Sequence, residues 1–131
     1  MTSDLWALVA TIALAMVQLG AASIVSLRQL GGDWVLGPRD QPREAVGLAG
    51  RVVRAHRNLL EIFPQFAAAL FVVHAAGATG AAANVGAWLF FAARVLYVPA
   101  YVVGPPGLRP LCWMAAQVGV VVILAGLVVR G

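Results

Sequence analysis

Charged residues are scarce in this chain. Of its 131 residues, 62% are hydrophobic and 11% are charged, and the mean hydropathy is +0.90. A typical soluble domain is ~45–50% apolar and ~25% charged. This composition excludes a soluble globular enzyme, and it also excludes a disordered tail, because disordered segments are poor in hydrophobic residues.

Lysine is absent, and cysteine occurs once. The single cysteine, Cys112, cannot form a disulfide within the chain, which excludes a disulfide-stapled secreted module. The nine basic residues are all arginine, and the net charge is +4. They form no water-facing basic stripe interleaved with polar residues, which nucleic-acid binding requires, so we expect no nucleic-acid partner.

Histidine is also rare, and its spacing excludes a shared metal site. His56 and His74 are 18 residues apart, which places them ~27 Å apart along one helix. They cannot bind the same metal ion, so we expect no metal cofactor.

Long hydrophobic runs dominate the rest of the chain. The first has no ionisable side chain from Leu5 to Leu27, and at ~1.5 Å per residue it spans a ~30 Å hydrocarbon core. We expect it to be retained, because Asp4 rather than a basic residue precedes it and it exceeds the ~7–15 apolar residues of a signal peptide. The predicted spans are residues 5–27, 45–76, 82–103 and 109–129.

Short turns join the last three spans, so neighbouring helices should pack antiparallel. The sequence therefore predicts a single all-α integral membrane domain over residues 1–131, an up-and-down bundle of four transmembrane helices. The connection from Arg28 to about Glu44 is rich in glycine, proline and aspartate, which favour turns. Ala115, Gly119 and Gly126 form a small-residue strip that would let another helix approach closely, although such residues are common in membrane helices.

The distribution of arginine predicts the orientation in the membrane. Four arginines (Arg28, Arg39, Arg43 and Arg51) flank the first connection and Arg109 flanks the third, whereas the second has no charge and the C-terminus has only Arg130. The positive-inside rule then places the first and third connections in the cytoplasm and both termini outside.

The second span carries a polar stripe on one helical face. At 100° per residue, Arg51, Arg54, Asn58 and Glu61 fall within an arc of roughly 80°, and Arg57 widens it to roughly 120°. A charge at membrane depth costs ~2.5–3.5 kcal/mol unless it is paired or solvated. The stripe should therefore face the bundle interior or a wet cavity near the cytoplasmic side, and Glu61, the deepest member, needs a cation.

The third span supplies that cation. Arg94, Tyr97 and Tyr101 share one helical face, and we expect Arg94 to pair with Glu61. For the pair alone, an ion pair that fixes helix register is as good an explanation as a catalytic role.

Three arginines of this region (Arg54, Arg57 and Arg109) have no acidic partner in the spans. The surplus positive charge would attract an anion, preferably one with carboxylates that accept bidentate hydrogen bonds.

These residues also carry a family resemblance. The string from Arg51 to Glu61, RVVRAHRNLLE, followed by Pro64, resembles the second-helix signature of the MAPEG family, the membrane-associated proteins in eicosanoid and glutathione metabolism. That family includes microsomal glutathione transferases and the microsomal prostaglandin E synthase. The resemblance covers essentially the whole chain and extends to four further residues: Arg94, Tyr97, Tyr101 and Arg109. The loop Gly37-Pro38-Arg39-Asp40 is similar to that of bacterial members, which implies the bacterial inner membrane.

The resemblance implies a homotrimer that holds glutathione, as cosubstrate, in a cytoplasm-facing groove between subunits. Arg109 and Tyr101 would be catalytic, although Pro110 and Trp113 depart from the family pattern beside them. The glutathione-binding residues would be Arg54, Arg57, Asn58, Glu61, Arg94 and Tyr97.

The implied activity is that of a glutathione-dependent membrane transferase or peroxidase. A thiol with a pKa near ~8.5 is only a few per cent ionised at neutral pH, and a nearby guanidinium or hydroxyl donor favours the nucleophilic thiolate. Lipophilic electrophiles would reach the site from the bilayer. The alternative is a non-catalytic trimeric membrane protein that keeps the polar groove for assembly or for binding another anion.

Overall fold

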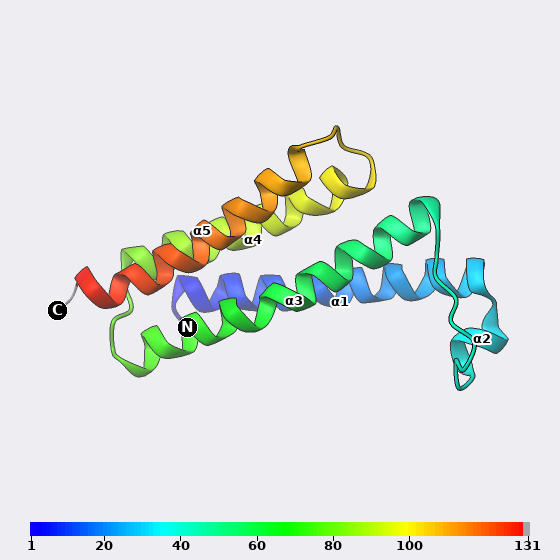
Figure 1. Cartoon of the computed structure of the whole chain (residues 1–131). Coiled ribbons are helices and arrows are strands. Elements are labelled where there is room, and N and C mark those ends of the chain that lie inside the picture. Colours follow the sequence, from blue (N-terminus) through cyan, green and yellow to red (C-terminus); the bar gives the residue numbers. More distant parts are fainter. Residues whose placement is uncertain (130–131) are drawn as a thin grey trace.

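The protein is all-helical, as predicted from its sequence. The structure is a computed structural model that describes residues 1–129, so Arg130 lies outside the described part. Four of the helices are long and apolar enough to cross a membrane. The elements, shown in Figure 1, are α1 (Ser3–Leu30), α2 (Gly32–Leu36), α3 (Gly47–Ala75), α4 (Ala81–Val102) and α5 (Leu108–Val129).

The long helices begin and end within three residues of the limits predicted from the hydrophobic runs. The first connection differs from the prediction, because it contains the short helix α2 in addition to turns. Gly31, with φ of 85°, ends α1 in a conformation that residues with a Cβ rarely adopt, and the chain then resumes one helical turn at Gly32. Asp4, placed before the first span by the sequence, lies in the first turn of α1 and is buried.

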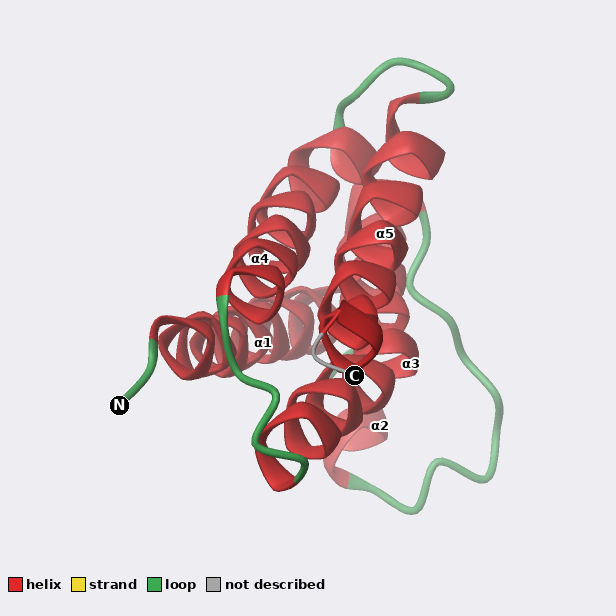
Figure 2. Ribbon diagram, turned by 90° about the vertical axis from the view of Figure 1, so that its left-hand side faces the viewer, coloured by secondary structure: helices red, strands yellow, loops and turns green. Residues whose placement is uncertain are grey.

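The helices form two antiparallel pairs, α1 with α3 and α4 with α5, which Figures 1 and 2 show from two directions. Helix α4 also packs on α1 and α3, whereas α1 and α5 do not touch. Both described ends of the chain and the α3–α4 turn lie at one end of the bundle, here called the terminal end. The α1–α3 connection and the α4–α5 loop lie at the opposite end, here called the loop end.

An aromatic stack joins the two pairs to each other, and a close glycine contact joins the helices of the α4–α5 pair. The rings of Phe66 on α3 and Phe90 on α4 stack with centroids 4.0 Å apart, and both side chains are fully buried. A Cβ on Gly119 of α5 would lie 2.6 Å from the carbonyl oxygen of Gly86 on α4. The small-residue strip of the fourth span therefore serves α4 of the same chain, whose backbone comes too close for any side chain at Gly119.

A polar cluster ties the helices together at the terminal end. His74 Nε2 on α3 lies 2.8 Å from Asp4 Oδ2 on α1, which is the single ion pair among residues 1–129. The backbone N–H of Asp4 donates to the side-chain oxygen of Asn84 on α4 at 3.0 Å. One buried carboxylate residue thus connects three helices.

Candidate functional site

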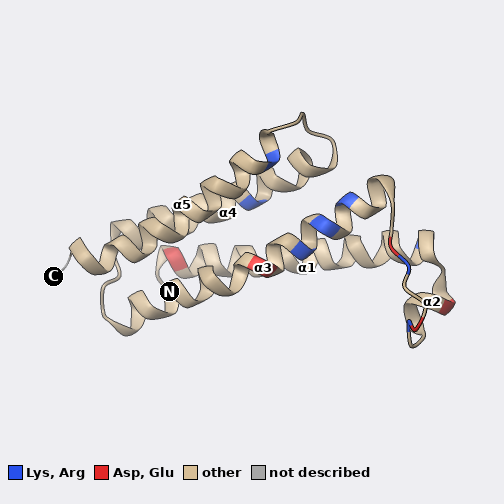
Figure 3. Cartoon of the chain, viewed as in Figure 1, with Lys and Arg blue, Asp and Glu red and all other residues tan. Residues whose placement is uncertain are grey.

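The described arginines gather in the loop-end half of the molecule (Figure 3). They come from α1, α3, α4, α5 and the first connection, and none of residues 1–129 near the terminal end is basic except His74. Folding therefore brings together positive charges that lie far apart in the sequence, at the end where a candidate site for an anion can form.

Arg94 is the most buried charge of this region, because its side chain is 0% exposed. Its Nη1 donates to Asn58 Oδ1 at 3.1 Å, and its guanidinium carbon lies 4.0 Å from the centre of the Tyr97 ring. Nε and Nη2 have no hydrogen-bond partner within the described chain. Buried polar groups are almost always paired in native proteins, so two free donors at one guanidinium indicate a place for an acceptor that the chain itself does not supply.

The direct ion pair expected between Glu61 and Arg94 is wrong. Asn58 lies between them, because it accepts from Arg94 and its Nδ2 donates to Glu61 Oε2 at 3.4 Å. The physical reason is that Asn58 is half-buried at the contact of α3 with α4, whereas Glu61, one turn further along α3, is exposed in the single chain.

The two tyrosines of α4 stack, with ring centroids 5.7 Å apart. The Tyr101 hydroxyl accepts a hydrogen bond from Arg54 Nε on α3 at 3.0 Å, and the guanidinium carbon of Arg109 on α5 lies 5.0 Å from the Tyr101 ring centre. Tyr101 therefore joins two arginines that are 55 positions apart in the sequence by a hydrogen bond on one side and a cation–π contact on the other.

A cavity of about 280 Å³ opens between α3, α4 and α5, here called the central pocket. It is lined by Asn58, Tyr97, Arg109, Pro110 and Trp113. A second cavity of about 430 Å³ lies beside the α4–α5 loop and includes Arg51, Arg54, Tyr101 and again Arg109. Arg109 lines both, so the two openings share a cationic wall.

Not every predicted site residue faces these openings. Arg57 lines another cavity, between α1 and α3, which Arg54 also reaches. Arg51, Arg54, Arg57 and Glu61 are exposed in the single chain. The sequence left two placements open for the polar stripe, the bundle interior or a wet cavity. Its arginines and Asn58 line cavities rather than the packed interior of the bundle.

The central pocket is thus a polar pocket with one arginine, Arg109, in its wall, and it lies between the second, third and fourth long helices of the bundle. The model of the MAPEG family matches residues 5–129, nearly the whole chain. The chain belongs to the MAPEG family. That family includes glutathione transferases and peroxidases as well as non-catalytic members, so membership leaves the activity open. No curated protein and no solved structure gives a significant match.

Two features of this MAPEG chain were missed by sequence reasoning. The first is the Asp4–His74 pair, although antiparallel packing puts the start of the first span level with the end of the second. The second is the cavity between α1 and α3, which includes Arg39 and Arg43 of the connection. The signal for it was a charged connection of unusual length, which the topology argument used only for orientation.

Proposed function

We propose that this protein is a glutathione-dependent membrane transferase or peroxidase that acts on lipophilic electrophiles. The observation that carries the proposal is the central pocket, where Arg109 faces Asn58 and Tyr97 and where both of these residues contact the buried Arg94. Glutathione is a peptide with two carboxylates and one amino group. The Arg109 guanidinium in this pocket, the arginines of the adjoining cavity beside the α4–α5 loop and one nearby carboxylate, Glu61, suit that charge pattern.

The chemistry falls to the residues nearest the pocket opening. The Arg109 guanidinium lines both loop-end cavities, so it can lie beside the thiol of a peptide bound to Asn58 and Tyr97. A guanidinium there stabilises the thiolate, which is the nucleophile for conjugation and for peroxide reduction. Tyr101 holds Arg54 and the face of its ring supports Arg109, so its hydroxyl and ring position both arginines.

A homotrimer, as the family resemblance implies, also answers a physical problem of the single chain. Arg57 and Glu61 lie well inside α3 and are exposed. Facing hydrocarbon, each would cost about 2.5–3.5 kcal/mol. A neighbouring copy packed against this face of α3 would remove both from lipid, and glutathione would then lie between subunits.

The orientation follows from the same arginines. Because the described arginines gather at the loop end, the positive-inside rule favours a cytoplasmic loop end, where glutathione is available. Lipophilic electrophiles would enter from the bilayer between the helices.

The test measures thiolate formation and turnover on the same detergent-purified protein. Ultraviolet difference spectra report the glutathione thiolate, and a chromogenic aryl halide and a lipid hydroperoxide report conjugation and reduction. The proposal predicts a thiolate signal and turnover of at least one substrate, with the thiolate signal lost and kcat lowered about 10²-fold in Arg109→Ala. Glutathione binding with no thiolate signal would favour the non-catalytic groove instead.

A further inference from the structure

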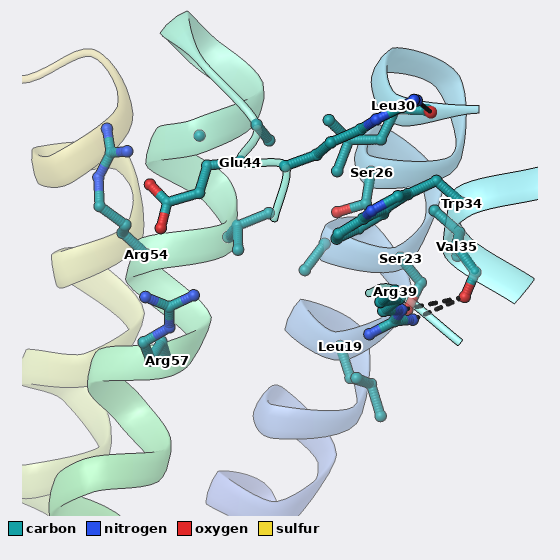
Figure 4. Close-up of a pocket in the computed structure, with 15 residues that line it drawn as sticks. Leu19, Ser23, Ser26, Leu30, Trp34, Val35, Arg39, Glu44, Arg54 and Arg57 are labelled. Carbon is teal, nitrogen blue, oxygen red and sulfur yellow. Dashed lines mark hydrogen bonds between the residues drawn. The ribbon is translucent and has the colours of Figure 1, made fainter. Parts of the chain in front are cut away.

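A cavity of about 340 Å³ lies between α1, α3 and the connection that contains α2, apart from the central pocket (Figure 4). Its α1 wall is apolar with two serine hydroxyls, Ser23 and Ser26, whereas the charged side chains come from the connection and from α3. Arg39, Arg43 and Glu44 of the connection form its rim, and Arg54 and Arg57 lie deeper, on the α3 wall.

The cavity as a whole has a surplus of positive charge. Four arginines face one carboxylate, Glu44, which Figure 4 shows on the side of Arg54 and Arg57. No ion pair joins Glu44 to any arginine within residues 1–129. A guanidinium carries five N–H donors, and phosphate oxygens accept them in bidentate pairs, so this cavity suits a phosphate better than it suits a cation or a neutral group.

The Arg39 side chain is held in place by two hydrogen bonds and a cation–π contact. Its Nε and Nη2 donate to the Val35 carbonyl oxygen at 3.2 and 2.8 Å, and its guanidinium carbon lies 5.3 Å from the Trp34 ring centre. Its backbone φ is 59°, in the left-handed region that costs a residue with a Cβ roughly 1–2 kcal/mol. Glycine would avoid that cost, so an arginine at this position points to a role for its side chain.

The length of the cavity along α1 and its opening onto apolar surface suit an amphiphilic ligand. From Leu30 at the rim to Leu19 at the deep end of the α1 wall, α1 descends eleven residues, or roughly 16 Å. Leu19 is 54% exposed, so this wall continues onto the apolar outer face of α1. At the rim, the Trp34 indole donates to the Gln41 carbonyl oxygen at 2.6 Å, which fits a tryptophan at the level of lipid headgroups.

We propose that this cavity binds an anionic phospholipid, with the headgroup phosphate against Arg39 and Arg43 and one acyl chain along α1 toward Leu19. Basic pockets between transmembrane helices at the headgroup level bind such lipids. The inference goes beyond the proposed function and needs no glutathione. Arg54 and Arg57 add positive charge from α3, and none of these four arginines lines the central pocket.

The test counts lipids retained by the full chain in detergent micelles, using native mass spectrometry without glutathione. Phosphatidylglycerol and phosphatidylcholine with identical acyl chains are offered in turn. Wild type should retain phosphatidylglycerol in preference, and Arg39→Gln or Arg43→Gln should each weaken that retention about fivefold. Arg28→Gln is the matched control, because Arg28 is an exposed arginine near the same end of α1 that does not line the cavity.

Three results would overturn the proposal. Equal retention of the two lipids by wild type would show that the headgroup charge is not recognised, and this comparison needs no variant to fold. An equal loss in Arg28→Gln would show general surface attraction rather than a site. Displacement of phosphatidylglycerol by millimolar inorganic phosphate would show a site for the free anion.

Discussion

The Arg94 guanidinium on α4 is fixed to α3 by one hydrogen bond, from its Nη1 to Asn58 Oδ1 at 3.1 Å. Asn58, which accepts this hydrogen bond, and Tyr97, whose ring lies 4.0 Å from the guanidinium carbon, both line the central pocket. The fully buried Arg94 therefore contacts two residues of the candidate site. Two of its buried nitrogens, Nε and Nη2, have no hydrogen-bond partner among the described residues, which is rare for buried donors.

Asn58→Ala should destabilise the protein as well as the site, because it leaves the Arg94 guanidinium buried with no hydrogen-bond partner. The expected loss in the free energy of unfolding is about 1–3 kcal/mol. Thermal unfolding in detergent, followed by circular dichroism, measures it. Asn58→Asp keeps an acceptor for Arg94 and is the matched control. Equal stability of Asn58→Ala and wild type would refute the structural importance of this bond.

Arg109→Ala should lower turnover more than affinity. Loss of one preorganised group that stabilises a developing anion costs about 10²-fold in kcat. Because Arg109 is exposed, glutathione affinity should fall by less than about fivefold. Steady-state kinetics and titration separate the two effects, with Arg28→Ala as the control arginine. Unchanged turnover in Arg109→Ala would exclude the activation role.

The fold was predictable from hydrophobic runs, because four apolar stretches joined by short turns allow few arrangements in a membrane. Helical periodicity also placed Asn58 and Glu61 on one face of the second span, and Arg94 and Tyr97 on one face of the third span. Periodicity gives the direction of a side chain but not the residue that it contacts on the next helix. It therefore could not show that Arg94 would form its hydrogen bond with Asn58 rather than an ion pair with Glu61.

Arg57 shows a second limit of sequence reasoning. A polar arc of roughly 120° is too wide for all of its residues to face one pocket, so a residue at the edge of the arc can face a different helix. In the structure Arg57 lines the cavity against α1, while Asn58 lines the central pocket against α4 and α5. The helix-to-helix geometry that separates these neighbours arises only on packing.

Gly119→Ala should weaken the α4–α5 pair. The added Cβ would meet the Gly86 carbonyl oxygen at 2.6 Å and the Phe90 backbone nitrogen at 2.9 Å, and backbone cannot move aside cheaply. The expected cost is about 1–3 kcal/mol in unfolding free energy. Gly126→Ala is the matched control, because its Cβ would lie 3.4 Å from the Ala82 Cβ and should be tolerated. Equal unfolding temperatures for the two variants would contradict the close helix approach.

The Asp4–His74 pair should contribute to stability without affecting the site. A double-mutant cycle with Asp4→Ala and His74→Ala should give a coupling free energy of about 1 kcal/mol, since both groups lie in membrane helices. Glutathione affinity should not change, because the pair lies at the terminal end. Asp33→Ala, an exposed carboxylate in α2, is the control for loss of a negative charge. Strictly additive losses would mean that the contact is not energetically important.

The central claim is that the central pocket binds glutathione. Calorimetric titration of glutathione into the detergent-purified protein tests this claim most directly. Wild type should show saturable binding. Glu61→Gln removes the carboxylate that would pair with the amino group of glutathione and should weaken binding at least about tenfold. Arg28→Gln should bind as wild type does. An absence of saturable heat in wild type, or equal binding by Glu61→Gln, would contradict the account.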